Sequence, residues 1–180
     1  MHRKKLSFLL IALLVLGVGS LVAGDQTEMV PSKTIMQNAS NAAQLSTLVS
    51  AIKAAGMEQL LEGSGPYTLF APNNEAFSEL PKGTLENLMK PENKAKLKAM
   101  LEMHVVQGKW TTADLKKKIE EGKGAELTCM TGEKLHIADH GGRMLMVKDN
   151  DDDIGMFLGS DQESSNGVVH VIDNVLSPKE

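Results

Sequence analysis

The chain has 180 residues, of which 42% are hydrophobic and 3% aromatic, and its formal net charge is −4. This length and apolar content suit one packed domain. The acidic balance argues against a nucleic-acid partner, because phosphates require a basic footprint. Cys129 is the single cysteine, so no intrachain disulfide can form and we expect a buried thiol.

The N-terminus has the layout of a secretory signal peptide. A short basic segment, 1–5, precedes a continuous apolar run, 6–16, and small residues follow up to Gly24. We predict a signal peptide over 1–24 and a secreted protein, extracellular or periplasmic, whose net charge falls to −7 when three basic residues are removed. The apolar run is short for a membrane span of about 20 residues, and an uncleaved membrane anchor is the alternative.

Helical periodicity follows a flexible lead-in. Residues 25–33 show no periodicity and contain a proline, whereas apolar residues recur at spacings of three and four over 34–55. This pattern predicts one helix, or two in series with a break near 38–41, and Gly56 is a suitable C-terminal cap. Further helical segments are expected over 84–89, 91–104 and 112–121.

The pattern changes to strands in the second half of the chain. From residue 125, short apolar runs alternate with turn signals, which indicates a meander of hairpins. The run 143–148 has large apolar residues on both sides, so we expect a strand covered on both faces. Helices first and strands later predict an α+β fold in a single domain over 34–178.

Two segments stand out as motifs. In YTLFAPNNEAF, Tyr67–Phe77, a strand should end at Pro72, and Asn73 or Asn74 should cap the helix that follows. In GVVHVIDNVL, residues 167–176, apolar residues alternate as they would in one long strand.

These segments resemble the signatures of the fasciclin (FAS1) family. TLFAPNNEAF matches the first signature, SNGVVHVID the second, and HVVQG, which begins at His104, matches an element between them. The resemblance covers roughly 34–178. It implies a FAS1-like fold in which N-terminal helices pack on a largely antiparallel sheet, as a wedge or sandwich, with the two signature segments as neighbours in the sheet.

The resemblance also implies a function. FAS1 domains are secreted or surface-associated modules for cell adhesion or for binding proteins, extracellular matrix or polysaccharide. We therefore expect a non-catalytic module without a cofactor, with a protein or glycan partner at the cell surface or in the matrix. Membrane contact is expected only through an uncleaved leader, and the oligomeric state is left open.

Two departures from the family pattern limit what can be carried over. Met103 stands where tyrosine usually precedes His104, so no ligand role for that phenol is expected. The segment 160–165, SDQESS, lacks the EPDIM-like motif that vertebrate members use for integrin contact, so integrin binding is not expected.

Six residues in or near the motifs are candidate binding residues. They are Asn73, Asn74, His104, Trp110, His170 and Asp173. We expect the asparagines and the aspartate to fix turns, and the histidines to tie strands to helices. No nucleophile–base pair or zinc-binding spacing accompanies the histidines, so a hydrolase is a distant alternative.

Exposed loops offer other binding positions. Trp110, the only tryptophan, is expected to be partly buried, although a partly exposed tryptophan is also a typical anchor for a partner. The loops near Lys82, Lys109 and 149–153 are polar, and loops on a rigid scaffold often carry binding sites.

An acidic run suggests calcium. Asp149, Asp151 and Asp153 have the spacing of the first half of a calcium loop, but Ile154 replaces the glycine of that pattern and Ser160 its final glutamate. We expect a solvated acidic hairpin tip. A calcium- or metal-dependent binding protein is the alternative function.

Soft donor atoms suggest copper. Thioether and imidazole ligands suit that metal, and such donors gather in Cys129, Met130, His136, His140, Met144 and Met146. Methionine also fills irregular cores where aromatic residues are scarce. We therefore expect these methionines to be core residues.

Overall fold

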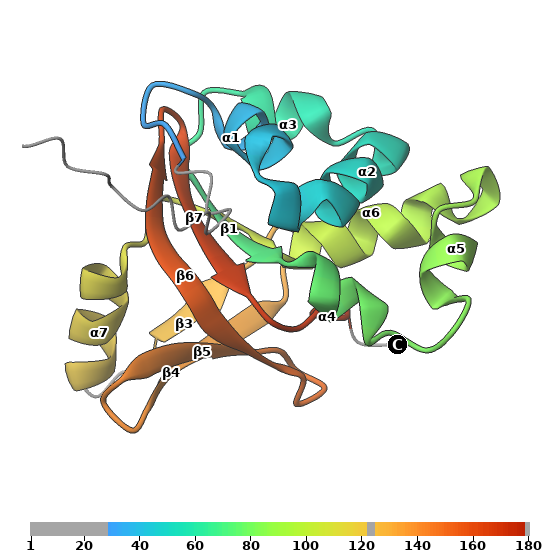
Figure 1. The fold of residues 1–180 in the computed structure, drawn as a ribbon. Helices are drawn as coiled ribbons and strands as arrows, with labels where there is room; N and C mark the ends of the chain where they lie inside the picture. Colours follow the sequence, from blue (N-terminus) through green and yellow to red (C-terminus); the bar gives the residue numbers. More distant parts are fainter. Residues whose placement is uncertain (1–28, 122–124, 179–180) are drawn as a thin grey trace, which may run out of the picture.

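The computed structural model describes residues 29–121 and 125–178 and confirms the α+β class. Helices from the first part of the chain form one layer, and the sheet lies beside them (Figure 1). The helices are α1 (Ile35–Asn41), α2 (Ser46–Ala55), α3 (Glu58–Glu62), α4 (Asn74–Ser78), α5 (Thr84–Leu88), α6 (Lys94–Met103) and α7 (Thr112–Glu120), with 3₁₀ turns η1 (Ala43–Leu45) and η2 (Pro91–Asn93). The strands are β1 (Tyr67–Pro72), β2 (Val105–Gln107), β3 (Ala125–Thr128), β4 (Lys134–His140), β5 (Met144–Lys148), β6 (Ile154–Ser164) and β7 (Gly167–Ile172).

The first helical stretch is two helices in series. Thr34 begins α1 with a capping box, in which its hydroxyl accepts from the N–H of Gln37 and the Gln37 side chain accepts from the N–H of Thr34. α1 stops because Ala42 is extended, and α2 ends at Gly56, whose φ of 71° is left-handed. The predicted break and the predicted cap are both confirmed.

The strands form one curled sheet in the order β2-β1-β7-β6-β5-β4-β3. β1 and β7 run parallel, whereas the other neighbours are antiparallel, so the largely antiparallel expectation is confirmed. An isolated bridge, Val106 to Cys129, links the middle of β2 to the segment after β3 and brings the two sheet edges together. The two signature segments are neighbours, as the family resemblance implies.

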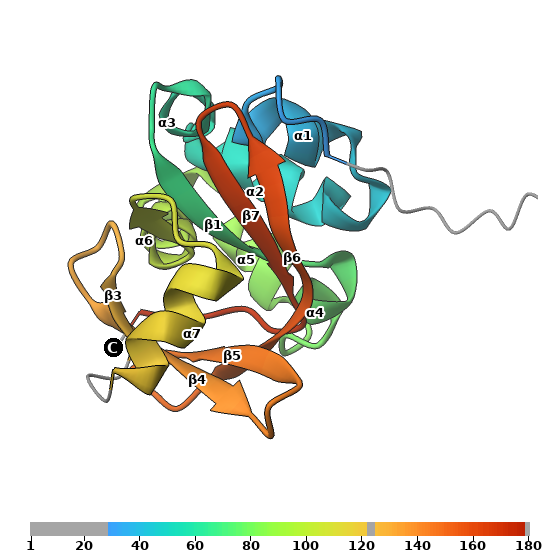
Figure 2. The same ribbon diagram turned by 90° about the vertical axis from the view of Figure 1, so that its left-hand side faces the viewer.

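Two cores lie on opposite sides of the β1–β7 pair. Leu69 and Val169 face the first core, beneath α1 to α6, whereas Phe70 and Ile172 face the second, inside the curl and under α7 (Figure 2). Gly167 allows β7 to approach β1 this closely, because a Cβ at that position would clash with the carbonyl oxygen of Tyr67.

Two strand predictions are wrong. β7 ends at Ile172 instead of continuing to residue 176, because the chain leaves the sheet at Asp173, whose carboxylate accepts from the N–H of Met156. β5 is covered on one face only: Leu145 is buried in the second core, but Met144, which points to the other face, is 40% exposed. No helix among the described residues is long and apolar enough to cross a membrane.

Candidate functional site

The asparagines and the aspartate of the motifs fix local structure. Asn73 caps α4, because its side-chain oxygen accepts from the N–H of Ala76 at 2.8 Å. Asn74 connects α4 to the start of α2, accepting from the N–H of Thr47 at 3.0 Å and donating to the carbonyl of Ala43 at 2.9 Å. Asp173 holds β6 next to β7. The predicted cap is confirmed at Asn73, whereas Asn74 and Asp173 join separate elements instead of fixing turns.

His104 joins α6 to the C-terminal segment. Its ring is 1% exposed, Nδ1 lies 2.9 Å from the carbonyl oxygen of Met100, and Nε2 accepts from the N–H of Leu176 at 3.0 Å. A carbonyl on one side and an N–H on the other fix the neutral ring with its proton on Nδ1. Burial lowers the pKa of His104 to about 4, so the ring stays neutral near pH 7.

His170 joins β7 to the α7 region. It is buried and stacked near Phe70 and Phe157, with ring centroids 5.7 and 5.0 Å away. Nδ1 accepts from the N–H of Asp161 at 3.2 Å, so Nε2 carries the proton and donates to the carbonyl of Trp110 at 2.7 Å. Burial lowers the pKa of His170 below its usual value. Both histidines therefore use both ring nitrogens internally.

Trp110 is half-buried, as expected. Its Nε1–H donates to the carbonyl of Gln107 at 3.1 Å, and the Lys118 ammonium lies 4.8 Å from the centre of the ring. The ring borders a hollow of about 550 Å³ between β2 and the end of β3. The backbone N–H of Trp110 donates to the Thr68 hydroxyl at 2.9 Å, so the residue is also tied to β1.

Asp149 corrects the expectation of a solvated acidic tip. It is 1% exposed, and its carboxylate accepts from the N–H groups of Asp151, Asp153 and Ser177, each at 3.0 Å. The Asp149 side chain points inward because it satisfies these three backbone N–H groups. Among the described residues, no group of three or more His, Cys, Asp and Glu side chains could hold a metal ion.

The sulfur-containing residues that suggested copper differ in burial. Cys129 is buried as predicted, with its Sγ 3.5 Å from the Sδ of Met103. The expectation that the methionines are all core residues is wrong, because Met130 and Met144 are each 40% exposed. They point outward from strands or turns that have core on one side only.

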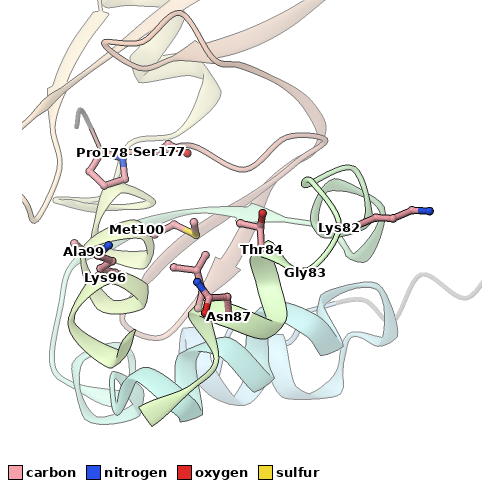
Figure 3. A pocket seen from close by; sticks show the side chains of 10 residues that line it. Lys82, Gly83, Thr84, Asn87, Lys96, Ala99, Met100, Ser177 and Pro178 are labelled. Atoms are coloured by element: carbon pink, nitrogen blue, oxygen red, sulfur yellow. The ribbon is translucent and has the colours of Figure 1, made fainter. Parts of the chain in front are cut away.

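A groove bordered by two lysines lies between α5, α6 and the C-terminal segment (Figure 3). Its volume is about 920 Å³. Thr84, Asn87 and Met100 lie close together in Figure 3, whereas the Lys82 side chain extends outward from the rim. The lining residues are Lys82, Gly83, Thr84, Asn87, Leu88, Lys96, Ala99, Met100, Ser177 and Pro178. We call this surface the α5–α6 groove.

His104 and Asp149 hold the walls of the α5–α6 groove. His104 binds the carbonyl of Met100, which lines the floor, and the N–H of Leu176, next to the C-terminal wall. Asp149 binds the N–H of Ser177 in that wall. His104 and Asp149 are therefore positioning residues for the groove and do not reach into it.

The groove is basic in an acidic chain. The segment 82–98 carries five lysines and two glutamates, whereas the whole chain has a net charge of −4. Sequence reasoning found Lys82 but missed the rest of the lining, which comes from three separate segments. The density of lysine in 82–98 was the one signal that could have pointed there.

Comparison with known proteins places this fold in a family. A model of the Fasciclin domain matches residues 43–178. Protein sll1483 of Synechocystis sp. is 41% identical over 145 residues, which are 81% of this chain and 73% of that protein. Transforming growth factor-beta-induced protein ig-h3 of Sus scrofa is 31% identical over 160 residues, which are 89% of this chain but 21% of that protein.

A solved structure agrees with the sequence relatives. The FAS1 domain pair of the insect cell adhesion molecule fasciclin I superposes with a TM-score of 0.74 at 20% identity, over 83% of this chain and 52% of that one. At that identity the likeness shows the fold alone. Together with the match of the family model, these similarities lead to one conclusion: the chain belongs to the fasciclin family.

Proposed function

We propose that this protein is an exported, non-catalytic binding module that holds an acidic polysaccharide of the cell surface or matrix in the α5–α6 groove. The observation that carries the proposal is the lysine-bordered groove on an otherwise acidic chain. The signal-like segment 1–24 supports export. Membership of the fasciclin family supports binding as the class of function, because FAS1 domains are modules for adhesion and binding.

The chemistry of the groove suits a charged sugar polymer. Lys82 and Lys96 are exposed and can pair with carboxylate or sulfate groups, while Thr84 and Asn87 offer hydrogen bonds to hydroxyls. Met100 and Leu88 present an apolar floor for the C–H face of a sugar ring. Exposed ion pairs contribute little singly, so we expect modest affinity that increases with the number of repeats.

Turnover is not expected at the motif histidines. His104 and His170 are buried, and the backbone partners of each ring fix a neutral tautomer with no free nitrogen. A general base must reach the proton that it removes. Neither ring is placed to do so, which supports a binding function for the domain.

The test compares acidic and neutral polysaccharides on a biosensor surface. We expect the chain to bind polygalacturonate or heparin but not dextran, with affinity decreasing as salt screens the charges. The double variant Lys82→Glu/Lys96→Glu should lose about tenfold or more in affinity, equivalent to about 1.4 kcal/mol.

The control makes the same charge change elsewhere. Lys116→Glu/Lys117→Glu alters two exposed lysines of α7, outside the groove, and should change affinity by less than about twofold. Equal losses in both double variants would show that net charge alone controls binding and would contradict the groove. Equal binding to dextran would contradict the acidic ligand, and a protein partner would then become the leading candidate.

A further inference from the structure

The strand register brings soft donors together on the outer face of the sheet. Met146 of β5 lies directly opposite Met156 of β6, and Met144 lies directly opposite His140 of β4. Leu145, Val147 and Phe157 alternate with them and are buried in the second core. The three methionines and the histidine therefore share the face that points away from that core.

The spacing allows the three methionine sulfurs to reach one point, with His140 directly beside Met144. Residues directly opposite on antiparallel strands have Cβ atoms about 5 Å apart, and alternate residues of one strand are about 6 to 7 Å apart. Each methionine sulfur lies two bonds beyond its Cβ on an unbranched, flexible chain. Met144, Met146 and Met156 can therefore converge without any change in the backbone.

The register also corrects the donor set expected from the sequence. Cys129 and Met130 lie at the far edge of the sheet, where Cys129 bridges Val106 and contacts Met103. Met156, eight residues beyond Lys148, enters the set only because β6 pairs with β5. His136 lies opposite Lys148 and 3.7 Å from a carboxylate oxygen of Glu126, away from the thioethers.

The surroundings favour a soft monovalent ion. Ile154 and Leu158 of β6 are exposed on the strand positions that flank Met156, and apolar neighbours limit competition from water. Lys148, two residues from Met146, is paired with Asp152 at 2.5 Å. Neutral thioether and imidazole donors suit Cu(I), whereas calcium and magnesium prefer oxygen.

We propose that the outer face of β4, β5 and β6 binds one Cu(I) ion through the sulfurs of Met144, Met146 and Met156 and a ring nitrogen of His140. The ligands are neutral, and binding involves no electron transfer. This site shares no residue with the α5–α6 groove, so its test is independent of the polysaccharide proposal.

The first test is a Cu(I) titration of the purified chain without oxygen, with ascorbate as reductant and bicinchoninate as a competing chelator. We expect the chain to take one equivalent from the chelator. Met146→Leu/Met156→Leu should weaken binding at least about a hundredfold, because two of the four ligands are lost. His140→Asn should weaken it less.

Two controls exclude the other soft donors. Met130→Leu removes a thioether that is as exposed as that of Met144, and Cys129→Ala removes the thiol; both variants should retain the wild-type affinity. Absence of binding, binding that survives the double substitution, or an equal loss in Met130→Leu or Cys129→Ala would overturn the proposal.

A second readout uses the unaltered chain, so a folding defect in a variant cannot obscure the result. With ¹³C-methyl methionine labelling, one equivalent of Ag(I), a redox-inert substitute for Cu(I), should shift the methyl resonances of Met144, Met146 and Met156. The methyls of Met130 and the buried Met103 should stay in place. Shifts centred on any other methionine, or none at all, would contradict the site.

Discussion

The β1–β7 pair and the β5 strand use apolar residues in opposite ways. Every residue of β7 is buried, because helices cover one side of the pair and the second core covers the other. β5 buries alternate residues only and exposes Met144. The difference teaches that the family motifs build the internal frame, whereas the outer strand faces and the α5–α6 groove are free to carry binding chemistry.

The largest effect should come from Asn166, a buried residue between β6 and β7. Its oxygen accepts from the N–H of Ile35, and its amide donates to the carbonyls of Leu61 and Gly63. Asn166→Ala leaves three backbone groups without these partners and should cost about 4 kcal/mol in the free energy of unfolding.

Urea denaturation measures the effect of Asn166→Ala. The matched control is Asn150→Ala, which removes one exposed hydrogen bond to Glu133 and should cost less than about 0.5 kcal/mol. Similar costs for the two variants would mean that the motif asparagine does not hold the frame together.

The next effect is the pH dependence that His104 contributes. Its pKa falls from 6.5 in the unfolded chain to about 4 in the folded protein, so the unfolded state binds the proton more readily. The stability contributed by the neutral ring is complete above pH 6.5 and is lost as pH falls toward 4. The loss should be about 3 kcal/mol.

His104→Gln tests how much of the pH dependence of stability comes from His104. The variant cannot titrate at that position, so its stability should fall by less than that of the wild type between pH 7 and pH 4 in urea melts at stepped pH. Parallel pH curves for the two proteins would show that burial of His104 does not control the acid response.

The third effect tests the two faces of β5. Leu145→Ala leaves a cavity in the second core and should cost about 3 kcal/mol, whereas Met144→Ala, on the exposed face, should cost less than about 1 kcal/mol. Thermal unfolding of both variants gives the comparison. Equal costs would mean that both faces of β5 are covered in solution.

The smallest of the four stability effects concerns Asp149 and Asp151, which lie in the same loop but differ in burial. Asp149→Asn weakens three hydrogen bonds that the buried side chain accepts and should cost about 2 kcal/mol. Asp151→Asn changes an exposed residue of the same loop and should be nearly neutral. If Asp151→Asn proved as destabilising as Asp149→Asn, the inward role assigned to Asp149 would be wrong.

Local patterns predicted much of the fold. The end of β1 at Pro72 and the left-handed Gly56 depend on a residue's own backbone chemistry, so sequence alone identified them. The cap of α4 was predicted at Asn73 or Asn74, and it is Asn73. The end of β7 depends on a contact between Asp173 and Met156, seventeen residues away, and was missed. The exposed face of β5 depends on which side of the sheet the second core occupies, which no local pattern reveals.

The candidate site was harder to predict because it is made by tertiary contacts. The α5–α6 groove unites residues from α5, α6 and the C-terminal segment, and only its lysine density could be read locally. Met156 joins Met146 through strand register. Asp149 turned inward because three backbone N–H groups surround it, including that of the distant Ser177.

The most direct test of the binding function is to map a ligand on the labelled protein by NMR. Amide shifts would be followed while an oligogalacturonate is added to the chain. We predict that the shifts concentrate on α5, the first turns of α6 and residues 177–178, and that Lys82→Glu/Lys96→Glu abolishes them. Shifts centred on Trp110 or spread over the outer sheet face, with α5 and α6 unchanged, would contradict the assignment of the groove.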